Sequence, residues 1–219
     1  MEKTMGAVMG DNMEEEIILE TERLALRRLR RADYDDLCQM LKDEEVMYAY
    51  EHAFEDWEAA DWLDRQLMRY EKYGFGLWAV ILKESGELIG QCGLTMQEAG
   101  EREVLEVGYL FRKDFWHCGY ALEAAAACRD YAFEKLGAEE VYSIIRDTNA
   151  PSRAVAERNG MTVCGSIVKH YYGMDMPHLL YRISRMEGGG RFGAEGGAGS
   201  GACVKCYFSS HTWNMKNFK

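Results

Sequence analysis

The sequence contains no run of about 18 consecutive apolar residues, the minimum length of a membrane-spanning helix. Its N-terminal segment, MEKTMGAVMGDNMEEEIILE, also lacks the apolar core and the cleavage site of a secretory signal peptide. The seven cysteines are odd in number, and without a secretion signal this indicates reduced thiols. We therefore expect a cytoplasmic protein with no membrane partner.

The sequence has too few basic residues to balance its acidic ones, and its formal net charge is −11 at pH 7. A surface with this charge repels nucleic acids and anionic membranes, so nucleic acid is not an expected partner. An amine substrate is compatible with it. Hydrophobic residues make up 47% of the 219 residues, which is enough for a sizeable core within one domain.

Strand-like and helix-like patterns follow one another in a mixed order along the chain. The order is strand, two helices, three strands, helix, strand, helix and two strands, beginning with the alternating run RLALRRL. It predicts an α/β fold with a central, mostly antiparallel mixed sheet of about seven strands, flanked by about four helices. We expect a leader over residues 1–18, the folded domain over 19–186, and a glycine-rich linker with a tail over 187–219.

The tail contains the pattern C-x-x-C, at Cys203 and Cys206, followed by His211. Such a pair is half of a zinc site, but a second pair of ligands is missing and the segment follows a glycine-rich linker. The sequence therefore predicts no metal.

The stretch FWHCGYALEAAA, residues 115–126, places a glycine directly before a run of small residues with helical character. Gly119 and Ala121 flank Tyr120 where the preceding strand, EVGYLF, gives way to this helix. The first N–H groups of a helix lack partners within the helix and carry partial positive charge, so they bind phosphate where side chains are absent. We interpret the turn as a cradle for a phosphate-bearing cofactor. The alternative is a loop glycine with tight helix packing.

The stretch from EVGYLF to RNGM resembles the central half of a GNAT-superfamily N-acetyltransferase, most closely the branch of the ribosomal-protein N-terminal acetyltransferases. The family's Q/R-x-x-G-x-G/A turn reads WHCGYA, with His117 and Cys118 where this branch often has Gly-Lys. A second segment, NAPSRAVAERNGM, resembles the family's N-x-x-S-x-x-V/L-x-x-x-x-G-F/M pattern. The resemblance covers residues 19–185. It implies the GNAT fold and acetyl-coenzyme A as co-substrate, bound between the strand that ends at Phe111 and the strand VYSIIRD.

The resemblance also implies which residues contact the coenzyme. The backbone at 110–111 is expected to bind its arm and the thioester carbonyl, and the backbone at 117–121 its pyrophosphate. The predicted cofactor-binding residues are Leu110, Phe111, His117, Cys118, Gly119, Tyr120, Ala121 and Asn149. Ser152 is expected near the leaving sulfur, and alternatively Ser152 or Asn149 caps the short helix.

Two further residues are candidates for catalysis. Glu106 lies in an otherwise apolar strand, where a carboxylate is costly unless it is solvated or paired. It is a candidate base or anchor for the substrate amine, and a paired or solvent-facing carboxylate is the alternative. Some members of the branch carry a glutamate in the strand after the short helix, where this chain reads VKHYYG. Tyr171 is a candidate proton donor there, with aromatic packing as the alternative.

The expected reaction is direct attack of a primary amine on acetyl-coenzyme A, without an acyl-enzyme. The acceptor is a protein N-terminus or a small amine such as a polyamine, an aminoglycoside or an amino-acid derivative. An acetyl-coenzyme A sensor or inactive paralogue is the alternative from a different class, because it would keep the turn but lack a working base. A homodimer is one of the assemblies that we consider.

Overall fold

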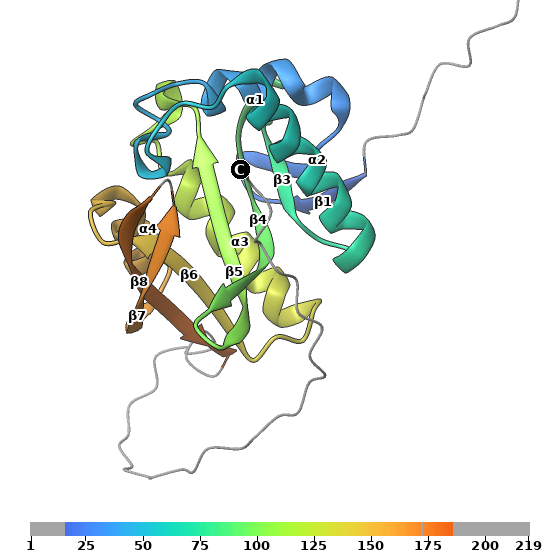
Figure 1. Cartoon of the computed structure of the whole chain (residues 1–219). Coiled ribbons are helices and arrows are strands. Elements are labelled where there is room, and N and C mark those ends of the chain that lie inside the picture. The colour runs from blue at the N-terminus through green and yellow to red at the C-terminus, as the bar shows by residue number, and fades with distance from the viewer. Residues whose placement is uncertain (1–15, 172, 186–219) are drawn as a thin grey trace, which may run out of the picture. The chain divides into compact units, whose positions relative to one another are not determined.

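Eight β-strands form one mixed sheet in the part of the chain that the structure, a computed structural model, describes: residues 16–171 and 173–185 (Figure 1). The order across the sheet is β1-β2-β3-β4-β5-β6-β8-β7. Neighbouring strands are antiparallel except β5 and β6, which are parallel. The strands are β1 Ile17–Glu20, β2 Leu24–Arg28, β3 Leu77–Leu82, β4 Leu88–Ala99, β5 Arg102–Phe111, β6 Glu140–Arg146, β7 Thr162–Tyr171 and β8 Met174–Ser184.

Four α-helices and three short 3-10 helices connect these strands within the described residues. They are η1 Arg31–Asp33, α1 Tyr34–Leu41, η2 Tyr48–Tyr50, α2 Asp56–Tyr73, η3 Lys113–Phe115, α3 Tyr120–Glu134 and α4 Ala150–Arg158. The predicted α/β fold with a mostly antiparallel mixed sheet and about four helices is confirmed. The additional strand is β1, a four-residue run that pairs with β2 at the sheet edge. None of the described helices is long and apolar enough to cross a membrane.

Residues 1–15, 172 and 186–219 lie outside the described part of the chain. The predicted leader up to residue 15 and the predicted linker and tail therefore lie outside it, and so do Cys203, Cys206 and His211.

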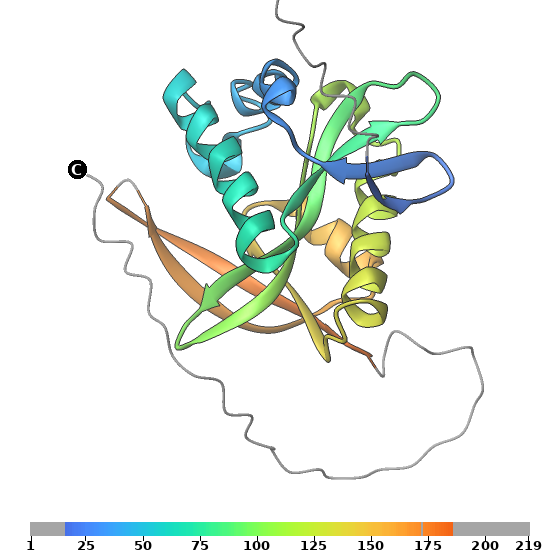
Figure 2. The same cartoon turned by 90° about the vertical axis from the view of Figure 1, so that its right-hand side faces the viewer.

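Helices α2 and α3 cover opposite faces of the sheet (Figure 2). On one face, Nε1 of Trp62 in α2 donates to Oε1 of Gln91 in β4 at 3.1 Å. On the other face, the Sγ atoms of Cys92 in β4 and Cys128 in α3 lie 3.6 Å apart. Consecutive residues of a strand point to opposite faces, so Gln91 and Cys92 assign one face to each helix. We call these the α2 face and the α3 face.

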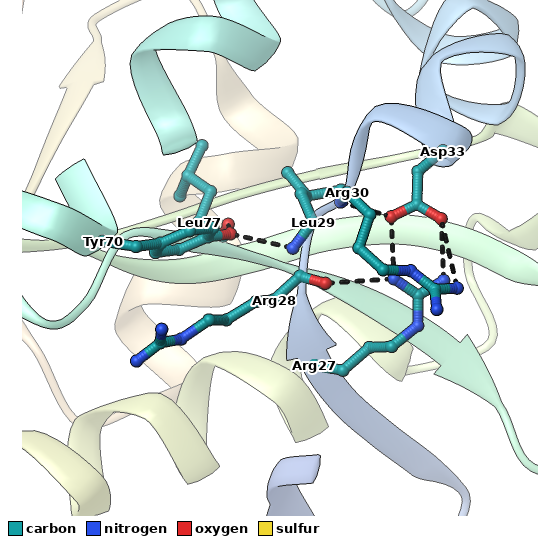
Figure 3. A network of polar contacts seen from close by, with 7 residues as sticks. All are labelled: Arg27, Arg28, Leu29, Arg30, Asp33, Tyr70 and Leu77. Carbon is teal, nitrogen blue, oxygen red and sulfur yellow. Dashed lines mark hydrogen bonds and ion pairs between the residues drawn. The ribbon is translucent and has the colours of Figure 1, made fainter. Parts of the chain in front are cut away.

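A buried polar network fixes α2 relative to the first strands (Figure 3). Arg27 in β2 donates from Nη1 and Nη2 to the carboxylate of Asp33, at 2.7 and 2.8 Å, and both residues are buried. The hydroxyl of Tyr70 in α2 accepts from the Leu29 amide at 3.1 Å and donates to the Leu77 carbonyl. Removing one partner of a buried ion pair is strongly destabilising because the other charge is left uncompensated. The ion pair therefore fixes η1 to β2, and the Tyr70 hydroxyl joins α2 to the end of β2 and the start of β3.

Strands β5 and β6 meet at one point and then separate. Within the described residues, one pair, Glu106 and Tyr142, joins the two strands. Because the strands are parallel, their C-terminal halves, 107–111 and 143–146, diverge beyond this point. Ser143 Oγ donates to the Val107 carbonyl at 2.9 Å just past the pair. Beyond this point, the backbone groups that β5 and β6 turn toward each other are not paired in the sheet ladder and can bind a ligand. We call this separation of the two strands the parting of β5 and β6.

Candidate active site

Helix α3 begins directly after a glycine in the left-handed conformation. Gly119 is the N-cap residue with a φ of +84°, and His117 has a φ of +61°. A side chain at 119 would strain the backbone, so the turn requires glycine there. Residues 117–119 are exposed, and Tyr120 and Ala121 are half-buried. The five predicted pyrophosphate-binding residues thus form one accessible helix start, which we call the α3 turn.

Arg23, which directly precedes β2, clamps the α3 turn. Its Nη1 donates to the Cys118 carbonyl at 3.0 Å, and its Nε donates to Glu123 Oε2 at 2.7 Å. The guanidinium carbon lies 4.4 Å from the centroid of the Tyr120 ring. A Cβ added at Gly119 would lie 3.4 Å from Arg23 Nη2, so the guanidinium stands beside the bare backbone. Nothing in the local sequence indicates this role of Arg23, because its partner Glu123 lies 100 residues away along the chain.

The partners of Glu123 keep this clamp charged. Thr21 Oγ1 and the Arg23 amide donate to Glu123 Oε1 at 2.6 and 2.9 Å. Burial by itself raises the pKa of Glu123, but the hydrogen bonds from Thr21 and Arg23 outweigh it and hold the pKa below its ordinary value. The hydrogen bond to Glu123 in turn raises the pKa of Arg23. A guanidinium held in place by the ionised Glu123 therefore lies next to the α3 turn.

The sheet register decides which backbone groups face the parting of β5 and β6. Arg112 donates its amide to a carbonyl of β4 at 3.0 Å, and hydrogen-bonded and non-bonded pairs alternate along the regular β4–β5 ladder. By this alternation Leu110 turns its amide and carbonyl toward β4, whereas Tyr109 and Phe111 turn theirs toward the parting. Of the two backbone positions predicted for the coenzyme arm, Phe111 therefore faces the parting and Leu110 faces the neighbouring strand.

Glu106 lies where β5 and β6 separate. Its carboxylate accepts from the Ile144 amide at 2.9 Å and from the Thr95 hydroxyl at 3.5 Å. Glu106 pairs with Thr95, which is four residues from Gln91 on β4, so its side chain belongs to the α2 face. Burial raises the pKa of Glu106 above its ordinary value, although the charge of Lys169 and the Ile144 hydrogen bond oppose this. Such a carboxyl is suited to accept a proton near neutral pH.

Asn149 and Ser152 form the start of α4. The Asn149 side chain accepts from the Ser152 amide at 3.1 Å, so Asn149 caps this helix as the alternative interpretation expected. The Ser152 carbonyl accepts from the Tyr109 hydroxyl at 2.9 Å, which ties β5 to α4 across the parting. Burial strongly raises the pKa of Tyr109, so it stays a donor. The half-buried Ser152 side chain also interacts with the Tyr109 hydroxyl.

Tyr171 ends β7, where it pairs with Met174 of β8. The end of β6 pairs with His178, so the β7–β8 hairpin continues about four residues beyond β6. The backbone of Tyr171 therefore lies past the carboxyl end of β6, toward which the parting of β5 and β6 opens.

The segment between α1 and α2, residues 42–55, reaches the far side of the parting. The Tyr48 hydroxyl donates to Asn149 Oδ1 at 2.7 Å, and Glu51 forms an ion pair with Arg146 at the end of β6. The ring centroids of Tyr50 and Trp62 lie 5.9 Å apart. Aromatic and acidic side chains from this segment thus connect α2 with β6 and α4. The local sequence does not indicate these contacts, because each joins residues that are far apart in the chain.

Residues 23–162 match the family model described as Acetyltransferase (GNAT) domain. The chain belongs to this family. As a GNAT acetyltransferase it is an acyl-coenzyme A-dependent acyltransferase. The prediction of a GNAT-type acyltransferase is confirmed.

Curated relatives and solved structures resemble most of the described chain. "Uncharacterized protein YkkB" from Bacillus subtilis is 34% identical over 152 residues, covering 69% of this chain and 88% of that protein. "Uncharacterized N-acetyltransferase p20" from Bacillus licheniformis is 34% identical over 61% of this chain and 76% of its own length. An acetyltransferase structure from Agrobacterium tumefaciens is 30% identical, with a TM-score of 0.65 over 76% of this chain and 94% of that one.

Two solved structures share the fold at lower identity. RimL, a ribosomal L7/L12 α-N-protein acetyltransferase in complex with coenzyme A, is 17% identical, with a TM-score of 0.63 over 77% of this chain and 98% of that one. The spermidine N-acetyltransferase from Vibrio cholerae, in complex with CoA and spermine, is 18% identical, with a TM-score of 0.63 over 76% and 98%. GNAT enzymes of one fold therefore act on both protein and polyamine acceptors.

Among residues 16–171 and 173–185 no group of three or more metal-ligating side chains comes together.

Proposed function

We propose that this protein transfers an acetyl group from acetyl-coenzyme A to a primary amine by direct attack, without an acyl-enzyme. The observation that carries the proposal is the parting of β5 and β6, with Glu106 at its point and the α3 turn following β5. Acetyl-coenzyme A, when bound, supplies the acetyl thioester. The residues of the chain bind it, orient the amine and move protons.

On the coenzyme side, the amides of residues 117–121 bind the pyrophosphate. The fit rests on an exposed helix start, on the missing side chain at Gly119 and on the positive charge of Arg23. The backbone of Phe111, which faces the parting, binds the arm and donates to the thioester oxygen as negative charge builds there. Leu110 precedes Phe111 in the same strand. Asn149 contributes to coenzyme binding by fixing the start of α4.

On the acceptor side, Glu106 receives a proton from the amine, directly or through one water. An amine attacks only in its neutral form, whereas a free lysine side chain has a pKa of about 10.4 and an α-amino group about 8. A partly buried carboxylate with a raised pKa both attracts the ammonium form and takes its proton. We propose entry of the acceptor from the α2 face, to which Glu106 belongs.

At the leaving sulfur, we propose that the Ser152 hydroxyl stabilises the departing thiolate as a hydrogen-bond donor. The support is its position at the start of α4, beside the Tyr109 hydroxyl that donates to the Ser152 carbonyl. Tyr171 is the second candidate for returning a proton, because its strand extends past the end of β6.

For the acceptor, we propose a protein N-terminus or a small amine. The sequence resemblance to the ribosomal-protein N-terminal acetyltransferase branch favours the first. Because RimL and the spermidine enzyme share this fold, the experiment below includes both peptide and small-amine acceptors.

The competing function is an acetyl-coenzyme A sensor without turnover. One observation favours it: the Glu106 carboxylate already accepts from the Ile144 amide, which favours its ionised form but occupies one oxygen. Calorimetry with acetyl-coenzyme A, together with thiol release over a panel of peptides and small amines, separates the two functions. Turnover supports the enzyme, and binding without turnover on any acceptor supports the sensor. Absence of binding contradicts both.

A further inference from the structure

One arginine on the α2 face has no ionic partner among the described residues. Arg69 is half-buried and makes one hydrogen bond, from Nη1 to Gln66 Oε1 at 3.0 Å. Arg65, one turn earlier, is ion-paired with Asp61. A guanidinium removed from water without a carboxylate is costly. Burial lowers the pKa of Arg69, which reflects this cost.

Arg69 lies on the ridge of α2 that runs along the sheet. Trp62, Gln66 and Arg69 follow the i, i+4, i+7 spacing of one helix side. Trp62 donates to β4 and Gln66 accepts from the Leu77 amide at 3.3 Å, so this ridge lies over β3 and β4. A Cβ added at Gly76 would lie 3.4 Å from the Arg69 Cβ, which places the base of this side chain over the start of β3.

Gly93, Gly108 and the side chain of Leu77 lie between Arg69 and β5. Gly93 of β4 pairs with Leu77 on one side and with Gly108 of β5 on the other. A Cβ added at Gly93 would collide with the Gly76 carbonyl, whereas one at Gly108 would meet a single atom, Leu77 Cδ2 at 3.7 Å. Gly108 is two residues from Glu106, so both belong to the α2 face. The surface between the arginine and the proposed base is therefore formed by glycine backbone and the Leu77 side chain.

A second cation lies level with the chain just past the end of β6, because Lys169 pairs with Met176 and His178 pairs with Arg146. Lys169 in β7 is half-buried and pairs with Met176 of β8. Burial raises the pKa of Glu106 and lowers the pKa of His178; the charge of Lys169 opposes the first shift and adds to the second. Two cations thus flank one carboxylate in a chain whose formal net charge is −11. A polyamine is itself positively charged and requires negative charge in its binding site, so this local excess of positive charge disfavours it.

We infer that the acceptor carries a carboxylate close to its reacting amine, and that Arg69, with Lys169 opposite, binds this carboxylate while Glu106 receives the amine. The inference rests on the proposed acetyl transfer and narrows its acceptor. A guanidinium binds a carboxylate through two parallel hydrogen bonds, which fixes orientation as well as charge. The shared chemistry fits a small amino acid or an acidic residue near a peptide N-terminus, and it disfavours spermidine.

The test compares acceptors in matched pairs that differ only in the carboxylate. One pair is a free α-amino acid and its amide, and a second pair is a peptide with Asp or Asn at its second position. Thiol release is measured for the full chain, for Arg69→Gln and for Arg65→Gln, whose charge is already paired. We expect the wild type to prefer the carboxylate member by about 10- to 100-fold in kcat/KM, the range of one charged hydrogen-bonded contact.

Arg69→Gln should remove this preference, mainly through KM, and leave the affinity for acetyl-coenzyme A unchanged. Arg65→Gln should keep the preference. If Arg69→Gln does not fold, as thermal unfolding will reveal, Arg69→Lys serves instead, with an intermediate preference expected because charge remains and the fork is lost. Whichever pair responds identifies the source of the carboxylate.

Equal turnover of both members by the wild type, preference for spermidine, or an equal loss on both members in the Arg69 variant overturns the inference alone. Binding of acetyl-coenzyme A without turnover of any acceptor overturns the proposed function, and the inference falls with it. The two failures are thereby distinct.

Discussion

The coenzyme side of the proposed site is mainly backbone from one short stretch, whereas the acceptor side consists of side chains from α2, β4, β5 and β7. On the coenzyme side, a left-handed glycine and the amides of one helix start are consecutive in sequence. On the acceptor side, Glu106, Arg69 and Lys169 meet only through the sheet register and the packing of α2. A contiguous backbone site suits a constant ligand, because its geometry depends on few other parts of the chain.

This contrast predicts that substitutions separate the two sides cleanly. Changes at the α3 turn should alter the affinity for acetyl-coenzyme A, and changes on the α2 face should alter the kinetics toward the amine. A variant that moves both equally would contradict the division.

The largest expected effect is at the α3 turn. Gly119→Glu should abolish measurable binding of acetyl-coenzyme A in calorimetry, because it adds bulk and negative charge where the pyrophosphate binds. It also imposes strain of about 1–2 kcal/mol at a positive φ. Gly137→Glu, after the other end of α3, is the matched control, since Gly137 has a φ of +67° and nothing within 4 Å of an added Cβ. Equal stability loss in both variants with unchanged binding in Gly119→Glu would refute the cradle.

The next effect concerns the base. Glu106→Gln should lower kcat by about 100- to 10,000-fold and leave acetyl-coenzyme A binding unchanged, because proton transfer is lost while Gln can still accept from the Ile144 amide. In the wild type, kcat/KM should fall as the pH drops through the raised pKa of Glu106, above the range of an ordinary carboxyl.

Stability gives an independent readout of the same group. A raised folded-state pKa means that the ionised Glu106 costs stability above the unfolded pKa of about 4.3, so Glu106→Gln should be at least as stable as the wild type at pH 7. Thermal unfolding across pH 4–8 measures this. An unchanged kcat in Glu106→Gln would mean that another group acts as the base.

The α3 turn was predictable from sequence because its requirement is local. A glycine before a helix with small residues reports its own backbone geometry, and Glu106 stood out as a carboxylate in an apolar strand. The backbone facing of Leu110 and Phe111 was not predictable, because it depends on the alternation of the β4–β5 ladder. Strand β1 was missed because four residues carry too weak an alternation.

The part of the site that could not be predicted from sequence consists of side-chain contacts between distant segments. Tyr109 reaches Ser152 across 43 positions of sequence, and Tyr48 reaches Asn149 across 101. Nothing in the local pattern of either tyrosine indicates its partner, because the contact exists only after the sheet has assembled. The acceptor side is therefore the part of the site for which the fold was needed.

Arg23 tests whether the coenzyme side extends beyond its contiguous stretch. Arg23→Gln should weaken acetyl-coenzyme A binding by about 10- to 100-fold, because one charged contact and the clamp on the Cys118 carbonyl are lost. Arg31→Gln is the control, since Arg31 is an exposed arginine paired with Asp64 at 2.6 Å. An unchanged dissociation constant in calorimetry would restrict Arg23 to a structural role.

The smallest expected effect lies where the two sides meet. Tyr48→Phe removes the 2.7 Å hydrogen bond to Asn149 Oδ1 and should release the 42–55 segment from α4. Asn149 still caps α4 through the Ser152 amide, so coenzyme binding should stay unchanged. The KM for the acceptor should rise by about 2- to 10-fold, the range of one neutral hydrogen bond. Tyr34→Phe, which removes a 3.1 Å bond to the Asp56 carbonyl at the start of α2, is the control. A rise in the dissociation constant of acetyl-coenzyme A instead would mean that the segment belongs to the coenzyme side.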